Sequence, residues 1–234
     1  MDDGSLPPLS TFPLPSSIPS SAVTFTYQDP EDRTGGHSQQ LSIYRRCLQT
    51  WGSQHTWMAF IDGDEFFEMT GGNETFPQFL QSMEDESIGA VAVNWRMHTS
   101  SGYLTRPDSV RKAFINCIWD GPPSDNSLTK SIVRTEFAES PQNPHLWYLK
   151  DGRVTVGEKG DLVDGNGVQS EALRNPISRA RVALHHYALK SREEYEEKML
   201  RGNAMDDPKG EGFWNSLEHT LPKVACPEMG FYDP

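Results

Sequence analysis

The segment Trp57–Phe67, WMAFIDGDEFF, contains the clearest structural signal in the sequence. Its first five residues are continuously apolar, which is typical of a strand covered on both faces in a parallel sheet. The apolar run ends abruptly in the acidic turn DGDE. In open α/β sheets, ligands bind beyond the carboxyl ends of the strands. The segment therefore predicts a buried strand that brings two carboxylates, Asp62 and Asp64, to one ligand site.

Helix and strand patterns alternate around this segment. Apolar residues three and four apart predict a helix that begins near His37 and another over 76–83. Ser191 is a typical N-cap for a helix that ends at Gly202. Short apolar or β-branched runs predict strands over residues 22–27, 88–97, 128–134, 153–156 and 182–189. The order of these elements predicts an α/β fold, with a mostly parallel sheet flanked by helices.

Composition and charge exclude several classes of protein. The 234 residues fit one domain, or one domain with tails, and 35% hydrophobic residues with 6 Trp and 11 Phe are too many for a disordered chain. The net charge of −12 argues against broad contact with a nucleic-acid backbone. A single nucleotide is still compatible, because a divalent cation can supply the positive charge. No apolar run within these residues is long enough to span a membrane. The three cysteines do not settle the redox compartment.

The spacing of Asp62 and Asp64 suggests a metal site. Hard divalent cations prefer oxygen ligands and usually share them with substrate phosphates, so the pair predicts a metal bridging a carboxylate and a diphosphate leaving group. The simpler alternative is a solvated acidic turn. An EF-hand loop is excluded because Phe66 and Asn73 occupy two of its ligand positions. A phosphohydrolase of the haloacid dehalogenase type, with Asp62 as nucleophile, stays open through the acidic pair Asp206-Asp207. Phe66 weakens it, since a small residue is usual there.

Several motifs resemble those of one enzyme family and come in the same order. They are D-D-G-S at 2–5, Gln40…Tyr44…Cys47, WMAFIDGDEFF, VAVNWRMHTSSG at 91–102, KSIVR at 130–134, and His186-Tyr187…Ser191…Lys198…Arg201-Gly202. Together they resemble a glycosyltransferase of the GT-A type, most closely family 92 and its family-2-like relatives. The resemblance covers most of residues 1–207. Two departures matter: the strand and helix expected before D-D-G-S are missing, which suggests a fragment, and Thr99 replaces a glycine before S-S-G.

The resemblance implies a GT-A-like (Rossmann-like) fold that transfers a sugar, expected to be galactose from UDP-galactose, to a glycan acceptor with inversion. It also implies dependence on Mn²⁺ (or Mg²⁺) and a Golgi membrane location on the lumenal side, with the anchor in a segment absent from this chain. With the Pro- and Ser-rich composition near the N-terminus, it divides the chain into three parts. These are a segment over 1–21 that includes the D-D-G-S turn, a transferase domain over 22–207 and a C-terminal tail over 208–234.

The same motifs assign roles in metal and nucleotide binding. Asp64 is expected to ligate the metal, and Asp62 to contact the metal or the nucleotide ribose. His186, at the end of an apolar strand, is a candidate third ligand, with a core histidine as the alternative. Asp3 is expected to contact the nucleotide base or ribose, unless the terminus is simply flexible. These residues would hold a cation that stabilises the departing diphosphate.

The remaining candidates belong to the phosphate, acceptor and base positions. Lys198 and Arg201 lie three apart on one predicted helical face and could hold phosphate, although ion pairs with the glutamates of that helix are the alternative. The acceptor side is expected to include Trp95, His98 and Gly102. An inverting enzyme needs a general base. Four candidates follow strand-like segments, and the sequence does not choose among them: Asp120, Glu136, Glu139 and His145.

Overall fold

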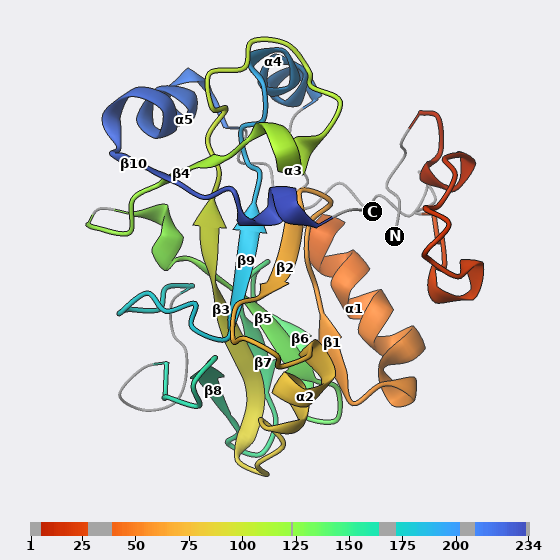
Figure 1. The fold of residues 1–234 in the computed structure, drawn as a ribbon. Helices are drawn as coiled ribbons and strands as arrows, with labels where there is room; N and C mark the ends of the chain where they lie inside the picture. The colour runs from red at the N-terminus through yellow and green to blue at the C-terminus, as the bar shows by residue number, and fades with distance from the viewer. Residues whose placement is uncertain (1–5, 28–38, 123, 164–171, 202–208, 233–234) are drawn as a thin grey trace.

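The computed structural model describes residues 6–27, 39–122, 124–163, 172–201 and 209–232. A six-stranded sheet has the order β1-β5-β3-β9-β2, with β8 also paired to β3 (Figure 1). Its strands are β1 Trp57–Ala59, β2 Glu65–Met69, β3 Ile88–Met97, β5 Thr129–Arg134, β8 Val154–Gly157 and β9 Val182–His186. Two smaller sheets pair β4 Asn116–Ile118 with β10 Lys223–Ala225, and β6 Ala138–Pro141 with β7 Trp147–Leu149.

Within the described ranges, five short to medium α-helices accompany these sheets. They are α1 Gln39–Trp51, α2 Phe76–Gln81, α3 Val110–Ala113, α4 Arg192–Arg201 and α5 Glu211–Asn215. Single helical turns are η1 Leu9–Thr11, η2 Ser20–Ala22, η4 Gly52–Gln54, η5 Asp125–Ser127, η6 Ser216–Thr220 and η7 Glu228–Phe231. None of the helices in the described ranges is long and apolar enough to cross a membrane. The helices α1, α2 and α4 confirm the three predicted from apolar spacing and capping residues.

The central sheet is mixed, which corrects the expectation of a mostly parallel sheet, and a GT-A arrangement is not confirmed by it. The pairings of β3 with β8 and β9 are parallel, whereas β1–β5, β3–β5 and β2–β9 are antiparallel. Because β1 and β3 are both antiparallel to β5, they run in the same direction, as does β9. β1 ends opposite Ile132, level with Val91 in the middle of β3. Residues 60–64 then carry the chain on to the end of the sheet where β3 and β9 finish and where β2 starts (Figure 1).

Strand β3 forms the centre of the core, as its largely apolar sequence predicted. Nine of its ten residues are buried. Ala90 and Val91 belong to different hydrophobic clusters, and so do Val133 and Ile132 on β5. Because side chains alternate between the faces of a strand, this division shows that both faces of the sheet are covered. One cluster contains residues of α2, α4 and α5, and the other contains residues of α1.

The interpretation of residues 57–61 as a fully covered parallel strand was wrong. β1 is a three-residue edge strand, antiparallel to β5, and its residues are half-buried or exposed. Phe60 follows it and is buried between the rings of Tyr44 and Trp147, at centroid distances of 4.9 and 4.7 Å. The apolar run thus reflects aromatic packing beneath α1 on one side, rather than helices on both faces of a central strand.

Two further expectations about local structure need correction. Residues 22–27 do not form a strand of any sheet: the turn η2 ends at Ala22, and this N-terminal segment lies apart from the central sheet (Figure 1). Strand β2 was not predicted, yet its five residues pair with β9 along their whole length. The division at residues 21/22 and 207/208 stays a prediction. Within 209–232, Trp214 and Leu217 lie in the core.

A disulfide joins a strand that precedes α4 in the sequence to a segment that follows α4. Cys117 on β4 is bonded to Cys226, which directly follows β10. The two residues are 109 positions apart in sequence. Cys47, half-buried on α1, is the free thiol that the odd cysteine count requires.

Candidate functional site

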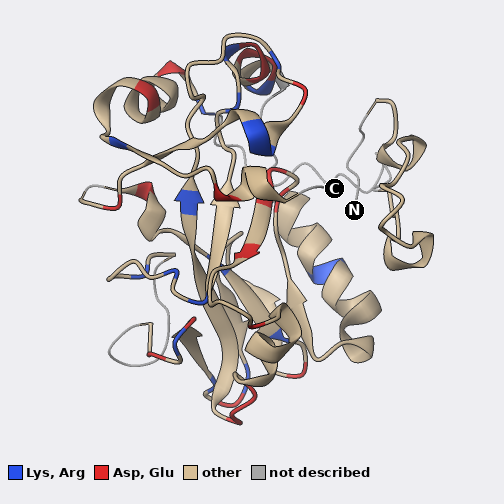
Figure 2. Cartoon of the chain, in the orientation of Figure 1, with Lys and Arg blue, Asp and Glu red and all other residues tan. Residues whose placement is uncertain are grey.

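The acidic turn lies at the end of the sheet where strand β9 ends. Within the turn, the Glu65 amide donates to the Asp62 carbonyl at 3.0 Å, which reverses the chain from β1 into β2. The Tyr187 amide, just beyond β9, donates to the Asp64 carbonyl at 2.9 Å. Asp64 is therefore held beside the end of β9, next to His186 and close to the start of α4. The acidic and basic residues that surround α4 are visible in Figure 2.

Asp64 forms the centre of a small charged cluster. Its Oδ2 lies 3.3 Å from Lys198 Nζ, and its Oδ1 lies 3.7 Å from His186 Nε2. Lys198 also donates to the Ala188 carbonyl at 3.0 Å. Burial raises the pKa of Asp64, but His186 and Lys198 lower it more, so its pKa is below the usual value. The cluster confirms neither predicted alternative for Lys198: its ion pair is with Asp64 rather than with glutamates of its own helix.

His186 is neutral at physiological pH and has an unsatisfied ring nitrogen. Burial lowers its pKa to about 4, against the opposing effect of Asp64. Its Nδ1 is buried without a hydrogen-bond partner in the described part of the chain. The ring packs against Trp95, with centroids 4.3 Å apart. A neutral imidazole beside an ionised carboxylate is a donor set that divalent transition-metal ions accept.

Asp62 faces a different set of partners from Asp64. Its Oδ1 accepts from Gln40 Nε2 at 2.6 Å, and its Oδ2 accepts from Lys130 Nζ at 2.9 Å. The side chain is 40% exposed. Among the described residues, the ligand atoms of Asp62, Asp64 and His186 do not gather within 4.8 Å of one another. The structure thus brings Asp64 and His186 together and leaves Asp62 beside them, neutralised by a lysine.

A buried ionic network joins Asp62 to the Asp64 cluster. Lys130 is 1% exposed, and its Nζ lies 3.5 Å from Glu65 Oε2. Glu65 accepts from Trp95 Nε1 at 2.8 Å, and Trp95 in turn packs on His186. Burial raises the pKa of Glu65 to about 7, although Lys130 opposes this. Burial lowers the pKa of Lys130, but Glu65 and Asp62 raise it more, so the lysine stays charged.

A pocket of about 320 Å³ opens beside Asp64. Three cationic side chains line it: Arg106, Lys190 and Lys198. The acidic side chains in its wall are those of Asp64, Glu194 and Glu197. The pocket is therefore polar and combines a carboxylate with several cations, a combination that suits a phosphorylated ligand that brings its own divalent metal.

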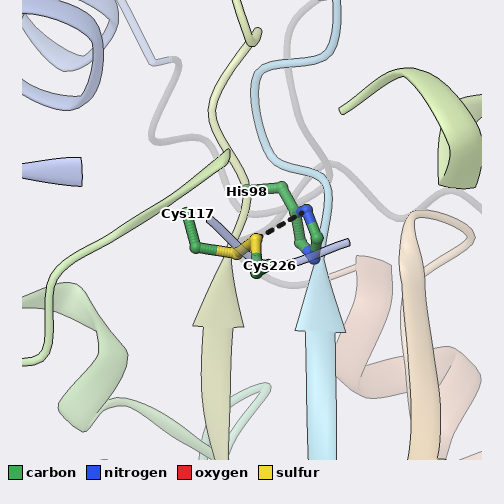
Figure 3. Close-up of side chains that lie close together, drawn as sticks. All are labelled: His98, Cys117 and Cys226. Carbon is green, nitrogen blue, oxygen red and sulfur yellow. Dashed lines mark hydrogen bonds between the residues drawn. A yellow bond between two sulfur atoms is a disulfide. The ribbon is translucent and has the colours of Figure 1, made fainter. Parts of the chain in front are cut away.

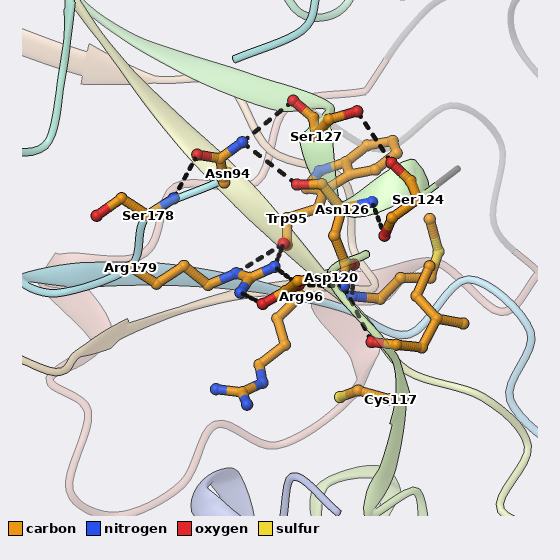
Figure 4. Close-up of polar contacts among 12 residues, drawn as sticks. Asn94, Trp95, Arg96, Cys117, Asp120, Ser124, Asn126, Ser127, Ser178 and Arg179 are labelled. Atoms are coloured by element: carbon orange, nitrogen blue, oxygen red, sulfur yellow. Dashed lines mark hydrogen bonds and ion pairs between the residues drawn. The ribbon is translucent and has the colours of Figure 1, made fainter. Parts of the chain in front are cut away.

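The four candidate bases occupy different surroundings. Asp120 is held by two hydrogen bonds from Arg179, at 2.8 and 2.9 Å, and one from Asn126 (Figure 4). Burial raises its pKa, but Arg179 lowers it more, which makes Asp120 a weak base. The exposed side chain of Glu136 pairs with Arg134. Glu139 is exposed on β6.

Of these candidates, His145 contacts a residue of the site. Its ring lies edge-on to Trp95, at a centroid distance of 5.1 Å. Its Nδ1 is 2.7 Å from the Thr129 carbonyl, which can only accept, so Nδ1 carries the proton. Burial and the neighbouring Lys130 lower its pKa to about 4. The neutral ring thus keeps a lone pair on Nε2.

The predicted acceptor residues do not share one surface. Gly102 is exposed in a turn and has a φ of +83°. Trp95 is buried with its indole N–H bonded to Glu65. His98 is 1% exposed, and both ring nitrogens are occupied: Nδ1 lies 2.6 Å from the Phe114 carbonyl, and Nε2 lies 2.8 Å from His185 Nδ1. His98 thus offers no polar atom to an acceptor.

The surroundings of His98 also exclude a metal there. His98, Cys117 and Cys226 place their potential ligand atoms within 4.8 Å of one another, the one such group of three among the described residues. The two sulfur atoms are joined in a disulfide, so neither is a thiolate ligand (Figure 3). His98 also stacks on Tyr187, with centroids 4.0 Å apart. The group is a packed part of the core.

We expect His98 to make the protein sensitive to acid. Burial and His185 lower the pKa of His98 to about 3, below the value of about 6.5 in an unfolded chain. Between these values the unfolded state binds a proton that the folded state does not, so the free energy of unfolding decreases as the pH falls below 6.5. Replacing His98 by Asn should make that decrease shallower by up to about 1.4 kcal/mol per pH unit.

Urea unfolding between pH 7 and pH 4 measures this slope for the wild type and the variant. The matched control is His219→Asn, because His219 is exposed and its removal should leave the slope unchanged. Only the slope is informative, since the substitution also removes the hydrogen bond from His185. Parallel curves for wild type and His98→Asn would show that His98 does not titrate as expected.

Two predicted residues cannot be placed, and two important ones were missed. Asp3 and the side chain of Arg201 lie outside the described residues. Lys130 and Glu65 both belong to the motifs, which predict no role for either. The sequence does contain a signal for Lys130: apart from Arg134 at its end, the rest of β5 is uncharged. A lysine on a buried strand needs a carboxylate partner.

Comparison with known proteins identifies the family. No curated protein matched the chain. The family model described as glycosyltransferase family 92 matches residues 10–220, which is most of the chain and includes both the acidic turn and α4. The Asp64 cluster, the buried Lys130 network and the adjoining pocket all lie within the matched residues. The chain belongs to glycosyltransferase family 92.

Proposed function

We propose that this glycosyltransferase transfers galactose from UDP-galactose to a glycan acceptor, with inversion, and that it uses Mn²⁺ or Mg²⁺. The observation that carries the proposal is the pairing of Asp64 with a neutral His186 beside a pocket lined by cations. The family membership supports a sugar donor and a glycan acceptor. The alternative of a phosphohydrolase with Asp62 as nucleophile has no such support.

The residues present fit a divalent cation. The carboxylate of Asp64 and the imidazole of His186 supply one oxygen and one nitrogen ligand, and diphosphate oxygens and water can complete the shell. When bound, the cation would neutralise charge that develops on the diphosphate leaving group. Lys198, which now neutralises Asp64, would then be free to turn its ammonium towards a phosphate.

Asp62 is better suited to hydroxyl groups than to the metal. Lys130 already neutralises its charge, and each carboxylate oxygen still has a lone pair after its bond to Gln40 or Lys130. The exposed side of the carboxylate can therefore accept hydrogen bonds from the ribose hydroxyls of a nucleotide. Lys130, which is buried, and Gln40, which is half-buried, hold its orientation before the donor binds.

We also propose a lumenal location, on the Golgi membrane, for the protein in the cell. The disulfide between Cys117 and Cys226 supports an oxidising compartment, where such bonds persist. The location is otherwise taken from the resemblance to the family.

A thermal-shift titration of the chain tests the donor site. UDP and UDP-galactose with Mn²⁺ should raise the Tm by about 5–10 °C at a hundredfold excess over Kd. EDTA should abolish the rise, and GDP should give a smaller one if the site reads uracil. A cooperative melt without any shift from UDP ligands would contradict the proposal and favour a non-catalytic chain. UDP-glucose in a parallel titration tests the choice of sugar.

A further inference from the structure

Lys190 has an unusual backbone conformation next to the pocket. Its φ is +58°, in the left-handed region that costs an L-residue about 1–2 kcal/mol. The flanking residues fix this conformation: Leu189 is 1% exposed, and Ser191 is fully buried. Ser191 also exchanges hydrogen bonds with Glu194 in the first turn of α4. The strained backbone conformation is therefore found at a residue that carries a cation.

The charge of Lys190 acts on Asp64 from a distance but has no ion-pair partner in direct contact among the described residues. The residue makes no hydrogen bond or ion pair within the described part of the chain, although it is half-buried and lines the pocket. The other two cations of the pocket are engaged. Arg106 pairs with Glu197 at 2.5 Å and with Glu194 at 3.7 Å, and Lys198 pairs with Asp64. Lys190 is thus the cation that remains available to an anionic ligand.

The position of Lys190 relates it to Asp64. Both residues line the same pocket, and the charge of Lys190 contributes to lowering the pKa of Asp64. A strained backbone is tolerated where it serves a site, and an ammonium that lines such a pocket without an ion pair in direct contact is suited to phosphate.

We propose that Lys190 binds the diphosphate of the nucleotide donor, as a second cation beside Lys198. The inference rests on the proposed function, because it requires a nucleoside diphosphate in the pocket. Lys190 would contact the donor before transfer and contact the released UDP more strongly, because negative charge grows on the diphosphate as the bond to the sugar breaks. The lysine keeps its proton throughout.

The test is calorimetric titration of the whole chain with UDP and with UMP, at one Mn²⁺ concentration and one ionic strength. Lys190→Gln should weaken UDP binding by about 10- to 100-fold, the value of a charge-assisted hydrogen bond. The loss for UMP, which lacks the β-phosphate, should be smaller. Lys190→Arg should stay within about threefold of the wild type. The control Lys159→Gln removes an exposed lysine outside the pocket and should change nothing.

Lys190→Gly separates binding from folding. Glycine adopts a positive φ without strain, so this variant should melt no lower than the wild type while it binds UDP as weakly as Lys190→Gln. A merely structural lysine would not give this combination. If the wild type binds UDP and Lys190→Gln binds it equally well, the inference is wrong and the proposed function stands. If the wild type itself does not bind UDP, both are wrong.

Discussion

Replacing Asp64 by Asn is expected to lower kcat/KM for the UDP-sugar by about 10³-fold. The substitution keeps the shape of the side chain but removes the negative charge that would hold a cation against the diphosphate. Losing one strong electrostatic contact to a developing oxyanion costs about 10²–10³-fold in rate. Here the cation itself would also be lost. Release of UDP from UDP-galactose, with and without a pool of glycan acceptors, measures the effect.

The expected loss should not come from unfolding. Lys198, the ion-pair partner of Asp64, is 29% exposed and can be solvated when the carboxylate is removed. The Tm of Asp64→Asn should therefore change little in the absence of nucleotide. The control is Asp108→Asn, which removes an exposed aspartate that does not line the pocket. An Asp64→Asn variant that kept its activity and its Mn²⁺-dependent response to UDP would show that this carboxylate is not the cation ligand.

A strand could be predicted from the sequence where its local apolar pattern matches the burial of its residues in the structure. The sequence predicts β3 to the residue, because layers on both faces make every position but one buried. The same apolar signal in Trp57–Ile61 misleads, since an edge strand followed by a buried phenylalanine produces an identical pattern. Periodicity cannot distinguish these cases. Strand direction was equally inaccessible, because pairing with β5 depends on residues more than 70 positions away.

Strand β2 could not be predicted because of the charged residues that it contains. Its sequence EFFEM contains two glutamates, and a local pattern reads these as solvent-exposed. In the structure Glu65 is satisfied by Trp95 and Lys130, and Glu68 lies 2.8 Å from His185 Nε2. These partners are between 30 and 117 residues away. A buried charge is tolerated only through such contacts, which no local pattern records.

The residues of the candidate site that belong to a recognised motif could be predicted. Their arrangement in space could not. Asp64 and His186 come from segments that the resemblance joined, and the structure places them 3.7 Å apart. The split between Asp64, facing the pocket, and Asp62, facing Lys130, follows from the sharp turn between β1 and β2 and has no signature in the D-x-D spacing. The left-handed conformation of Lys190 is likewise invisible in the sequence.

Replacing Lys130 by Met is expected to destabilise the protein by about 3–5 kcal/mol at pH 8, the cost of breaking a buried ion pair on one side. Methionine fills a similar volume but leaves the carboxylate of Glu65, whose side chain is fully buried, without its cation. Asp62, at 40% exposure, can be solvated instead and should contribute less. Urea unfolding of wild type and variant measures the difference, with Lys159→Met as the exposed control, expected within about 0.5 kcal/mol of wild type.

The pH dependence identifies Glu65 as the source of this loss. Burial raises the folded-state pKa of Glu65 to about 7, above the usual 4.5, and the loss of Lys130 would raise it further. A group with a raised pKa contributes stability that is fully present below 4.5 and is lost as the pH rises through the folded-state pKa. At pH 5 Glu65 is therefore neutral in both proteins, and the penalty of Lys130→Met should be clearly smaller than at pH 8. Adding Glu65→Gln to Lys130→Met should recover part of the loss at pH 8 and little at pH 5. Equal penalties at both pH values would place the cost in packing rather than in the unpaired carboxylate.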